Sequence, residues 1–170
     1  VGRLVVGAWG DADNGAYSGS VSVSAEVVTG TWGSEQKLTA SDGAGGDRFG
    51  WLVSISDDYM VVGSYQDDDN GTNSGSVYVY EKDVNGTWGS EQKLTASDGA
   101  ADDRFGRSVS ISGDQLVVGA YLDDDNGDAS GSVYVTTIFT PCTLTLSCPA
   151  DFAVDTDAGM CEATINFTAP

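Results

Sequence analysis

Short apolar runs, separated by clusters of glycine, aspartate and asparagine, set the pattern of this chain. Near its middle, residues 51–56 alternate apolar and polar side chains from Leu52 onward, and residues 60–65 form a continuous apolar run. Residues 76–80 are rich in β-branched and aromatic side chains, and residues 90–95 form a weaker, more polar run. Runs of this length between turn residues are typical of β-strands, and no window has the period of an amphipathic helix. The pattern predicts an all-β chain.

The four-strand pattern recurs with a period of 56 residues. Residues 30–44 return letter for letter at residues 86–100, and Phe49-Gly50 returns as Phe105-Gly106. Four strands in a repeat of this length are the unit of a β-propeller blade, and they fit the shorter coils of a β-helix poorly. A sandwich is the other alternative. The period therefore predicts a partial β-propeller of about two and a half four-stranded blades, with repeat units at residues 1–46, 47–102 and 103–138.

The first and last blades of this chain need neighbouring blades. One blade cannot bury both of its faces, so neighbouring blades from the rest of the chain, or from other subunits, should complete the ring. After Ser132–Val135 the segment expected for a fourth strand does not follow, and residues 136–141 suggest a domain boundary. That strand must come from elsewhere, as from the other end of the chain in closed propellers. Since the chain starts with Val1 in an apparent strand, we expect an interior piece of a longer protein.

The chain is strongly acidic, with 26 Asp and Glu residues against 7 Lys and Arg residues, a net charge of −19 and no histidine. Repulsion from phosphates excludes nucleic acid as a partner and disfavours an anionic membrane surface. No apolar run is long enough to span a bilayer. Without histidine, a Ser-His-Asp triad and a histidine-ligated zinc ion are also excluded.

An acidic loop follows the second predicted strand of each repeat, with the pattern D-x-D-N-G-x-x-S-G at residues 11–19, 67–75 and 123–131. Carboxylates two positions apart in a tight loop repel each other, and a hard cation with oxygen ligands removes that cost. Ca²⁺ fits such a loop better than Mg²⁺, which demands stricter octahedral geometry. The predicted calcium ligands are Asp11, Asp13, Asp67, Asp69, Asn70, Asp123, Asp125 and Asn126.

A plain acidic turn is the alternative, because Asn-Gly is typical of a type I′ hairpin turn. The loop also departs from the EF-hand pattern: with Gly71 at the sixth position, the first ligand would be Gln66. We prefer the register that begins at Asp67. The third copy, with Asp128 added, should bind calcium most tightly, and the first, with Ala12, most weakly. Because the loop repeats in every blade, a catalytic carboxylate pair is disfavoured.

Over about residues 1–138, the sequence resembles the FG-GAP repeat family, the blades of integrin-α-like propellers. The residues that carry the resemblance are Phe49-Gly50 with Gly63-Ser64-Tyr65, and Phe105-Gly106 with Gly119-Ala120-Tyr121. Tyrosine stands where the family has proline. The resemblance implies a propeller for adhesion or ligand binding at a cell surface, without catalysis.

Residues 139–170 have a different composition and contain all three cysteines. The segment 147–161, followed by Ala163–Phe167, resembles the hyalin (HYR) repeat, an immunoglobulin-like extracellular sandwich of which only the beginning is present. Three clustered cysteines suit an oxidising compartment, and their spacing does not suit zinc. We prefer a disulfide between Cys148 and Cys161, with Cys142 paired beyond the chain.

Two further features have simple interpretations. Trp32 and Trp88 repeat with the blades and are expected to pack between them, although exposed sugar platforms are the alternative. Arg48 and Arg104 follow Asp47 and Asp103 directly, so local ion pairs are expected.

Together these observations predict a secreted or surface-displayed, non-catalytic module that binds a protein or glycan at a cell surface or in the matrix. Two alternatives remain. The chain is an accessory propeller of a large secreted enzyme whose catalytic domain lies outside it, or it is a purely structural spacer.

Overall fold

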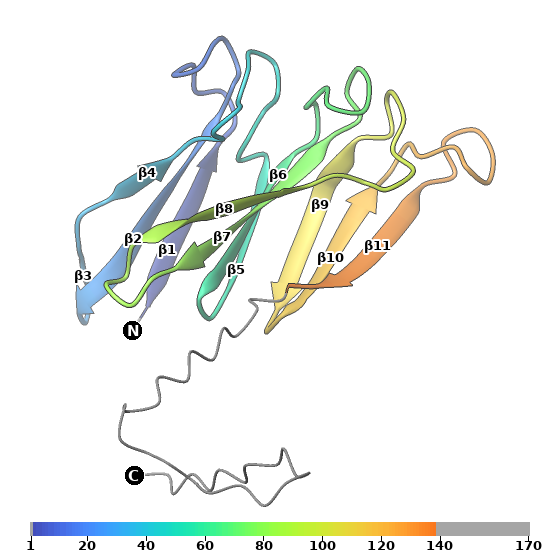
Figure 1. The fold of residues 1–170 in the computed structure, drawn as a ribbon. Helices are drawn as coiled ribbons and strands as arrows, with labels where there is room; N and C mark the ends of the chain where they lie inside the picture. Colours follow the sequence, from blue (N-terminus) through green and yellow to red (C-terminus); the bar gives the residue numbers. More distant parts are fainter. Residues whose placement is uncertain (1, 139–170) are drawn as a thin grey trace, which may run out of the picture. The chain divides into compact units, whose positions relative to one another are not determined.

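A computed structural model describes residues 2–138, which form three antiparallel β-sheets standing side by side (Figure 1). The first sheet contains β1 (Arg3–Ala8), β2 (Ser20–Val28), β3 (Thr31–Trp32) and β4 (Gln36–Leu38). The second contains β5 (Leu52–Ser56), β6 (Tyr59–Ser64), β7 (Ser76–Lys82) and β8 (Trp88–Leu94). The third contains β9 (Phe105–Ser112), β10 (Gln115–Ala120) and β11 (Ser132–Thr137). The predicted all-β fold, a partial β-propeller, is confirmed, and this part of the chain has no helix able to cross a membrane.

The second sheet has all four predicted strands, in the order β5-β6-β7-β8. Its boundaries match the sequence pattern to within two residues, with β8 starting at Trp88. The first sheet begins with the equivalent of β6, and the third ends with the equivalent of β7. Each loop between the second and third strand of a repeat therefore belongs to one hairpin, which is β1–β2, β6–β7 or β10–β11.

Two hydrophobic clusters hold the sheets together. The continuous apolar run of β6 is buried on both sides: Met60 and Val62 pack toward the first sheet, while Val61 packs toward the third. This is expected for a strand whose sheet is covered on both faces. Phe49 belongs to the cluster between the first and second sheets, and Phe105 belongs to the cluster between the second and third sheets. Each Phe-Gly phenylalanine therefore belongs to the core between two neighbouring sheets.

Glycine contacts also join neighbouring sheets. A Cβ atom on Gly63 would lie 2.2 Å from the carbonyl oxygen of Gly106, and one on Gly7 would lie 2.0 Å from that of Gly50. Backbone is a neighbour that cannot move aside easily, so only glycine fits at Gly7 and Gly63. This contact explains why the Phe-Gly pair of one repeat and a glycine of the preceding sheet occur together in the sequence.

The duplicated segment, identical in sequence, folds differently in its two copies. It forms the continuous strand β8 in the second sheet and the two short strands β3 and β4 in the first. Trp88 is 5% exposed, whereas Trp32 is 45% exposed. The cause is the preceding sheet, because Gln36 exchanges two hydrogen bonds with the Trp88 backbone and Arg3 lies over the Trp88 ring. The expected packing between blades holds for Trp88 and is wrong for Trp32.

The described strands belong to one compact unit, Val1–Phe139. The predicted HYR-like sandwich at residues 139–170 and the Cys148–Cys161 disulfide lie outside the described residues, and both stay predictions.

Candidate functional site

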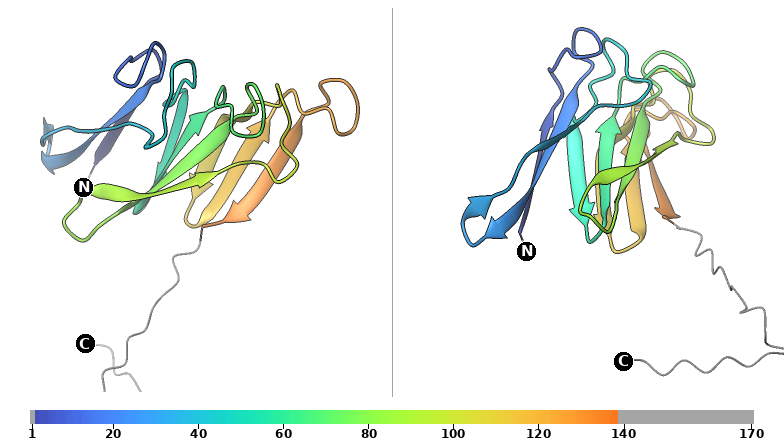
Figure 2. Two further views of the ribbon diagram at one scale, coloured as in Figure 1. Left: turned by 45° about the horizontal axis from the view of Figure 1, so that its top comes forward. Right: turned by 60° about the vertical axis from the view of Figure 1, so that its left-hand side comes forward.

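The three acidic loops lie at the same end of the sheets (Figures 1 and 2). In the second loop, Gly75 N donates to the Asp67 carbonyl at 2.9 Å, and Ser74 N donates to the Gly71 carbonyl at 2.9 Å. Gly71 has φ +127°, a conformation that glycine adopts without strain. These bonds close a compact loop that turns the chain from β6 into β7 and fixes both aspartates at its start.

Asp67 is the buried member of the second loop, with 3% of its surface exposed. Its carboxylate accepts hydrogen bonds from the Ser76 hydroxyl at 3.0 Å, the Tyr78 hydroxyl at 3.0 Å and the Asp69 backbone N at 3.2 Å. Ser76 and Tyr78 both lie on β7, the strand that the loop enters. A buried carboxylate requires such partners because desolvation of an unpaired charge is costly.

A lysine ammonium completes the second loop. Lys93 Nζ on β8 lies 2.9 Å from Asp67 Oδ2, 2.6 Å from Asp69 Oδ2 and 2.7 Å from Asp42 Oδ2. Lys93 pairs in register with Tyr78 across β7 and β8, which carries its side chain to the loop. Partial burial disfavours its charged form, but the bonds to the three carboxylates outweigh burial and raise the pKa of Lys93.

The first loop uses the same arrangement with one carboxylate fewer. Lys37 Nζ on β4 lies 2.6 Å from Asp11 Oδ2 and 2.5 Å from Asp13 Oδ2. The Lys37 bond, with further bonds from Ser20 and the Ala12 backbone, lowers the pKa of Asp11 to about 2. In both loops the repulsion expected from the sequence is therefore balanced by a lysine of the same sheet.

The third loop has the carboxylates without the lysine. The Tyr134 hydroxyl donates to Asp98 Oδ1 at 2.8 Å and to Asp123 Oδ2 at 2.9 Å, as Tyr78 does to Asp42 and Asp67. Position 149, one period after Lys93, is proline, and no ion pair reaches these acids within residues 2–138. The negative charge of Asp123, followed by burial and by further acids including Asp98, raises the pKa of Asp125.

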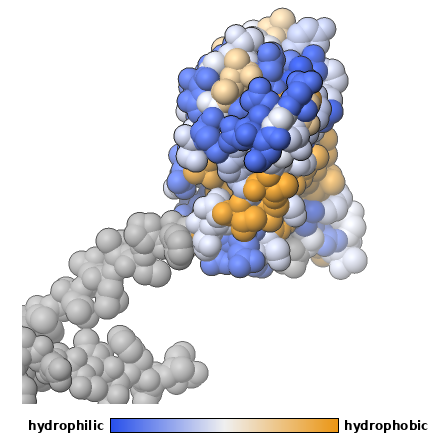
Figure 3. Space-filling view, turned by 90° about the vertical axis from the view of Figure 1, so that its right-hand side faces the viewer, coloured by the Kyte–Doolittle hydropathy of each residue, from blue (hydrophilic) through white to orange (hydrophobic). Residues whose placement is uncertain are grey.

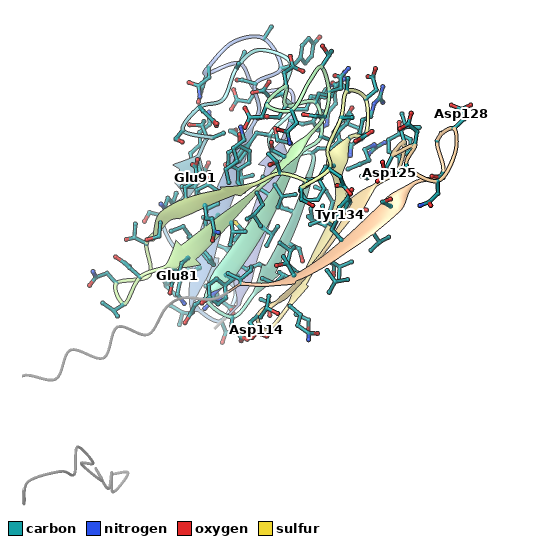
Figure 4. All side chains as sticks on the ribbon, turned by 45° about the vertical axis from the view of Figure 1, so that its right-hand side comes forward. Glu81, Glu91, Asp114, Asp125, Asp128 and Tyr134 are labelled. Carbon is teal, nitrogen blue, oxygen red and sulfur yellow. The ribbon has the colours of Figure 1, made fainter. Side chains whose placement is uncertain are left out.

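The other residues predicted as ligands point to different roles. The Asn70 amide donates to the Ala96 carbonyl at 3.3 Å, tying the loop to the segment that leads to the third sheet. Asn126 is exposed. Asp128 lies at the outer tip of its loop, apart from Asp125 and Tyr134 (Figure 4). Asn70 therefore has a backbone partner outside its loop, and Asp128 lies apart from Asp125.

The arrangement does not fit a calcium ion in the first two loops, because an ammonium already lies between the carboxylates. In the described part of the chain, no group of three or more acidic, histidine or cysteine side chains is arranged to hold a metal ion. Calcium binding by the loops stays a prediction. The lysines were not predicted as partners of the loops, although one signal was present: Lys37 and Lys93 each follow the first aspartate of their loop by 26 residues.

A second feature at the same end is a row of arginines and aromatic rings that crosses all three sheets. Trp9 and Trp51 have ring centroids 5.6 Å apart, and Trp51 and Tyr65 have centroids 4.9 Å apart. Arg107 Cζ lies 4.2 Å from the Trp51 centroid, a distance at which a cation attracts the ring face. We call these residues the arginine–aromatic row: Trp9, Arg48, Trp51, Tyr65, Arg104, Arg107 and Tyr121.

The arginines of this row do not form the local ion pairs expected from the sequence. Arg48 Nη1 donates to the Tyr65 hydroxyl at 2.6 Å, and Arg104 Nη1 donates to the Tyr121 hydroxyl at 2.9 Å. Asp47 instead accepts from Ala44 N at 2.7 Å, and its burial raises its pKa. The other four basic side chains, Arg3, Lys37, Lys82 and Lys93, all pair with aspartates. The row thus holds the arginines left without an acidic partner among residues 2–138.

Comparison with known protein families gives a match in two segments of the chain. The family model described as FG-GAP repeat matches residues 32–80 and 88–136. Each matched segment begins on the outer strand of one sheet and ends on the third strand of the next, so it includes one Phe-Gly pair. The glycine that this pair contacts, Gly7 or Gly63, lies before the segment. A search of curated proteins finds no match.

Proposed function

Because the chain belongs to the FG-GAP repeat family, a family of propeller-type ligand-binding or structural modules, we propose that it is a non-catalytic binding module. FG-GAP repeats are typical of extracellular proteins. The proposed ligand is a protein or glycan at a cell surface or in the matrix, and the proposed contact surface is the arginine–aromatic row.

The observation that carries this proposal is the state of the three arginines in the row. The protein has a net charge of −19, yet Arg48, Arg104 and Arg107 stack on rings instead of pairing with acids. Arg104 Nε is buried and has no hydrogen-bond partner among the described residues. Aromatic rings and arginine are the side chains most often found at the energetic centre of binding interfaces. A ligand with an anionic group beside a flat or apolar face would match this surface.

The test is a binding screen of the full chain on glycan arrays and on immobilised matrix proteins. Trp9 and Tyr121 are 39% and 46% exposed, so a ligand can reach both ends of the row. We expect the double variant Arg104→Ala/Arg107→Ala to lose at least about tenfold in affinity for a ligand found in the screen.

The matched control is Arg3→Ala, which removes an arginine that lies over Trp88 and pairs with Asp58. We expect this control to bind like the wild type. Equal binding by the double variant would reject the row as the contact surface. A screen without any ligand would favour the structural spacer, and a catalytic domain found beside these blades would favour the accessory propeller.

Calcium is not required by this proposal. If the loops bind calcium as the sequence predicts, the melting temperature will rise with added calcium and fall with a chelator, because a ligand bound only to the folded state stabilises it. Because Lys37 and Lys93 already pair with the carboxylates of the first two loops, we expect any calcium effect on the melting temperature to come from the third loop.

A further inference from the structure

Two exposed aromatic rings lie at the end of the arginine–aromatic row on the first sheet. Trp9 is 39% exposed, and Tyr17, in the first acidic loop, is 55% exposed. The two rings are stacked, with centroids 6.2 Å apart and planes 16° apart. Because the rings are nearly parallel, they present a flat aromatic face to solvent, which we call the Trp9–Tyr17 platform.

Tyr17 departs from the repeat at a position where the backbone is strained. Its φ is +60°, and the equivalent residues Asn73 and Ala129 have φ of +53° and +49°. Asparagine tolerates this left-handed conformation, whereas a bulky residue rarely adopts it. The Tyr17 ring belongs to neither hydrophobic cluster, so packing of the core does not account for it. Strain of this kind is concentrated at functional sites.

Arg48 lies beside the platform. Its Cζ is 5.3 Å from the Trp9 centroid, and its backbone N donates to the Tyr17 carbonyl at 3.0 Å. The guanidinium donates one hydrogen bond, from Nη1 to the Tyr65 hydroxyl, and its other N–H groups have no acceptor among residues 2–138. Arg48 is only half-buried, so these donors can reach a ligand. A guanidinium binds a carboxylate through two parallel hydrogen bonds.

The charge of the acidic loops favours this end of the row for an anion. From the first loop to the third, the loops contain two, three and four aspartates. Lys37 pairs with both aspartates of the first loop, whereas those of the third loop have no basic partner within residues 2–138. Hydrophilic side chains also gather at the loop end of the third sheet (Figure 3). An anionic group is therefore repelled least at the Trp9–Tyr17 platform.

We propose that the Trp9–Tyr17 platform and Arg48 bind a sugar residue that carries a carboxylate. The ligand of the proposed function is then an acidic glycan, and this assignment rests on that function. A pyranose ring has an apolar C–H face that stacks on aromatic rings. In a sugar acid the carboxylate stands at the edge of that ring, where Arg48 can bind it while the ring covers the platform. An acidic peptide carries its carboxylates on flexible side chains, without a flat apolar face beside them.

The experiment titrates the isotope-labelled full chain with methyl glucuronoside and follows the indole N–H signals of the four tryptophans by NMR. We expect a saturable shift of the Trp9 signal and no shift of the Trp88 signal, because Trp88 is buried on β8. Methyl glucoside has the ring without the carboxylate, and acetate has the carboxylate without the ring. Each should bind at least about fivefold more weakly, because each keeps only part of the contacts.

Variants assign the ring and the charge separately. Tyr17→Asn introduces the residue of the second loop and should weaken the glucuronoside about tenfold while acetate is unchanged. Arg48→Lys keeps the charge but loses the paired donors, so it should weaken the glucuronoside and acetate and leave the glucoside unchanged. The matched control is Trp32→Ala, which removes an exposed ring outside the row and should leave all three probes unchanged. Thermal melting checks that each variant is folded.

The sugar-acid assignment fails if the glucuronoside does not bind, if the glucoside binds equally tightly, or if a peptide of six glutamates binds in its place. The location fails if Tyr17→Asn binds like the wild type, or if Trp32→Ala weakens binding equally. Failure here is distinct from failure of the proposed function. A screened ligand that Arg104→Ala/Arg107→Ala loses and Tyr17→Asn keeps would leave the row as the contact surface and reject the platform.

Discussion

At the scale of single residues, the same aspartate has opposite electrostatic surroundings in consecutive repeats. Asp69 lies 2.6 Å from the Lys93 ammonium, whereas Asp125 faces other carboxylates, which raise its pKa. The two loops differ little in sequence. What differs is the presence of a fourth strand, so the electrostatics of each loop depend on its sheet.

We therefore expect opposite effects from the same substitution in these two loops. Asp69→Asn removes a partner of Lys93 and should lower the free energy of unfolding by about 0.2–1 kcal/mol, the usual range for an exposed ion pair. Asp125→Asn removes a repelled charge and should raise the melting temperature at pH 7. Thermal melting of both variants at low salt checks this pair, and a lowered melting temperature for Asp125→Asn would contradict it.

The first loop makes a prediction about pH. The pKa of Asp11 is lowered to about 2 in the folded state, below its ordinary value, because the ionised carboxylate binds Lys37. Its contribution to stability is thus fully present above about pH 4 and is lost as the pH falls through 2. Carboxyl NMR titration should report this low pKa in the wild type and an upward shift in Lys37→Met. An ordinary pKa for Asp11 in the wild type would show that the ion pair does not form.

At the scale of elements, the strands follow from the sequence pattern and their contacts explain the repeat. Alternation and β-branched runs predicted β5 to β8 closely, because each strand repeats the pattern of a half-buried or fully buried surface. The Phe-Gly pair and the glycine near the end of β6 were recognised as a motif. Their physical meaning, a backbone contact between Gly63 and Gly106, needed the packing of one sheet on the next.

This contact predicts unequal effects of one substitution at equivalent positions. Gly63→Ala places a Cβ atom 2.2 Å from the Gly106 backbone and should cost about 1–3 kcal/mol or more. Gly119→Ala meets only the Ser108 hydroxyl, a side-chain group that can rotate away, and should cost less. Chemical denaturation of both variants measures the difference. Equal losses would show that the close approach between sheets is not what requires glycine.

At the scale of the whole described unit, apolar surface is exposed on both outer sheets. Leu4 and Val6 are 46% and 49% exposed in the first sheet, although their equivalents Met60 and Val62 are fully buried. Val133 and Val135 are exposed in the third sheet, whereas Val77 and Val79 are buried. Neighbouring blades would cover these surfaces, as expected for repeats that bury their faces against one another.

A matched pair of substitutions tests this view. Val77→Thr puts a hydroxyl into the core between the second and third sheets and should cost about 1–3 kcal/mol. Val133→Thr, one period later, lies on the exposed side and should change stability by less than about 0.5 kcal/mol. Denaturant unfolding of the full chain checks both values. A large loss from Val133→Thr would mean that this face is already covered in the 170-residue chain.

The aspartates of the loops were visible in the sequence, but the lysines that pair with them were not. The acidic pattern indicated that the loops need positive charge, and a lysine provides it in the first two loops. The spacing of 26 residues between Asp67 and Lys93 carries no meaning until β7 and β8 pair in a register that sets Lys93 opposite Tyr78. Calcium was the simpler prediction because it requires only ligands within the loop. Lys93 lies 26 residues after Asp67 and was not predicted as a partner.

The sequence by itself determined the period, the strands and the class of fold, because these depend on local alternation of apolar and polar side chains. The tertiary structure alone decided how identical segments differ. Residues 30–44 and 86–100 have one sequence, yet Trp88 is buried and Lys93 binds a third carboxylate, Asp42, from the preceding repeat. Burial and ion pairing are properties of neighbours in space, and the two copies have different neighbours.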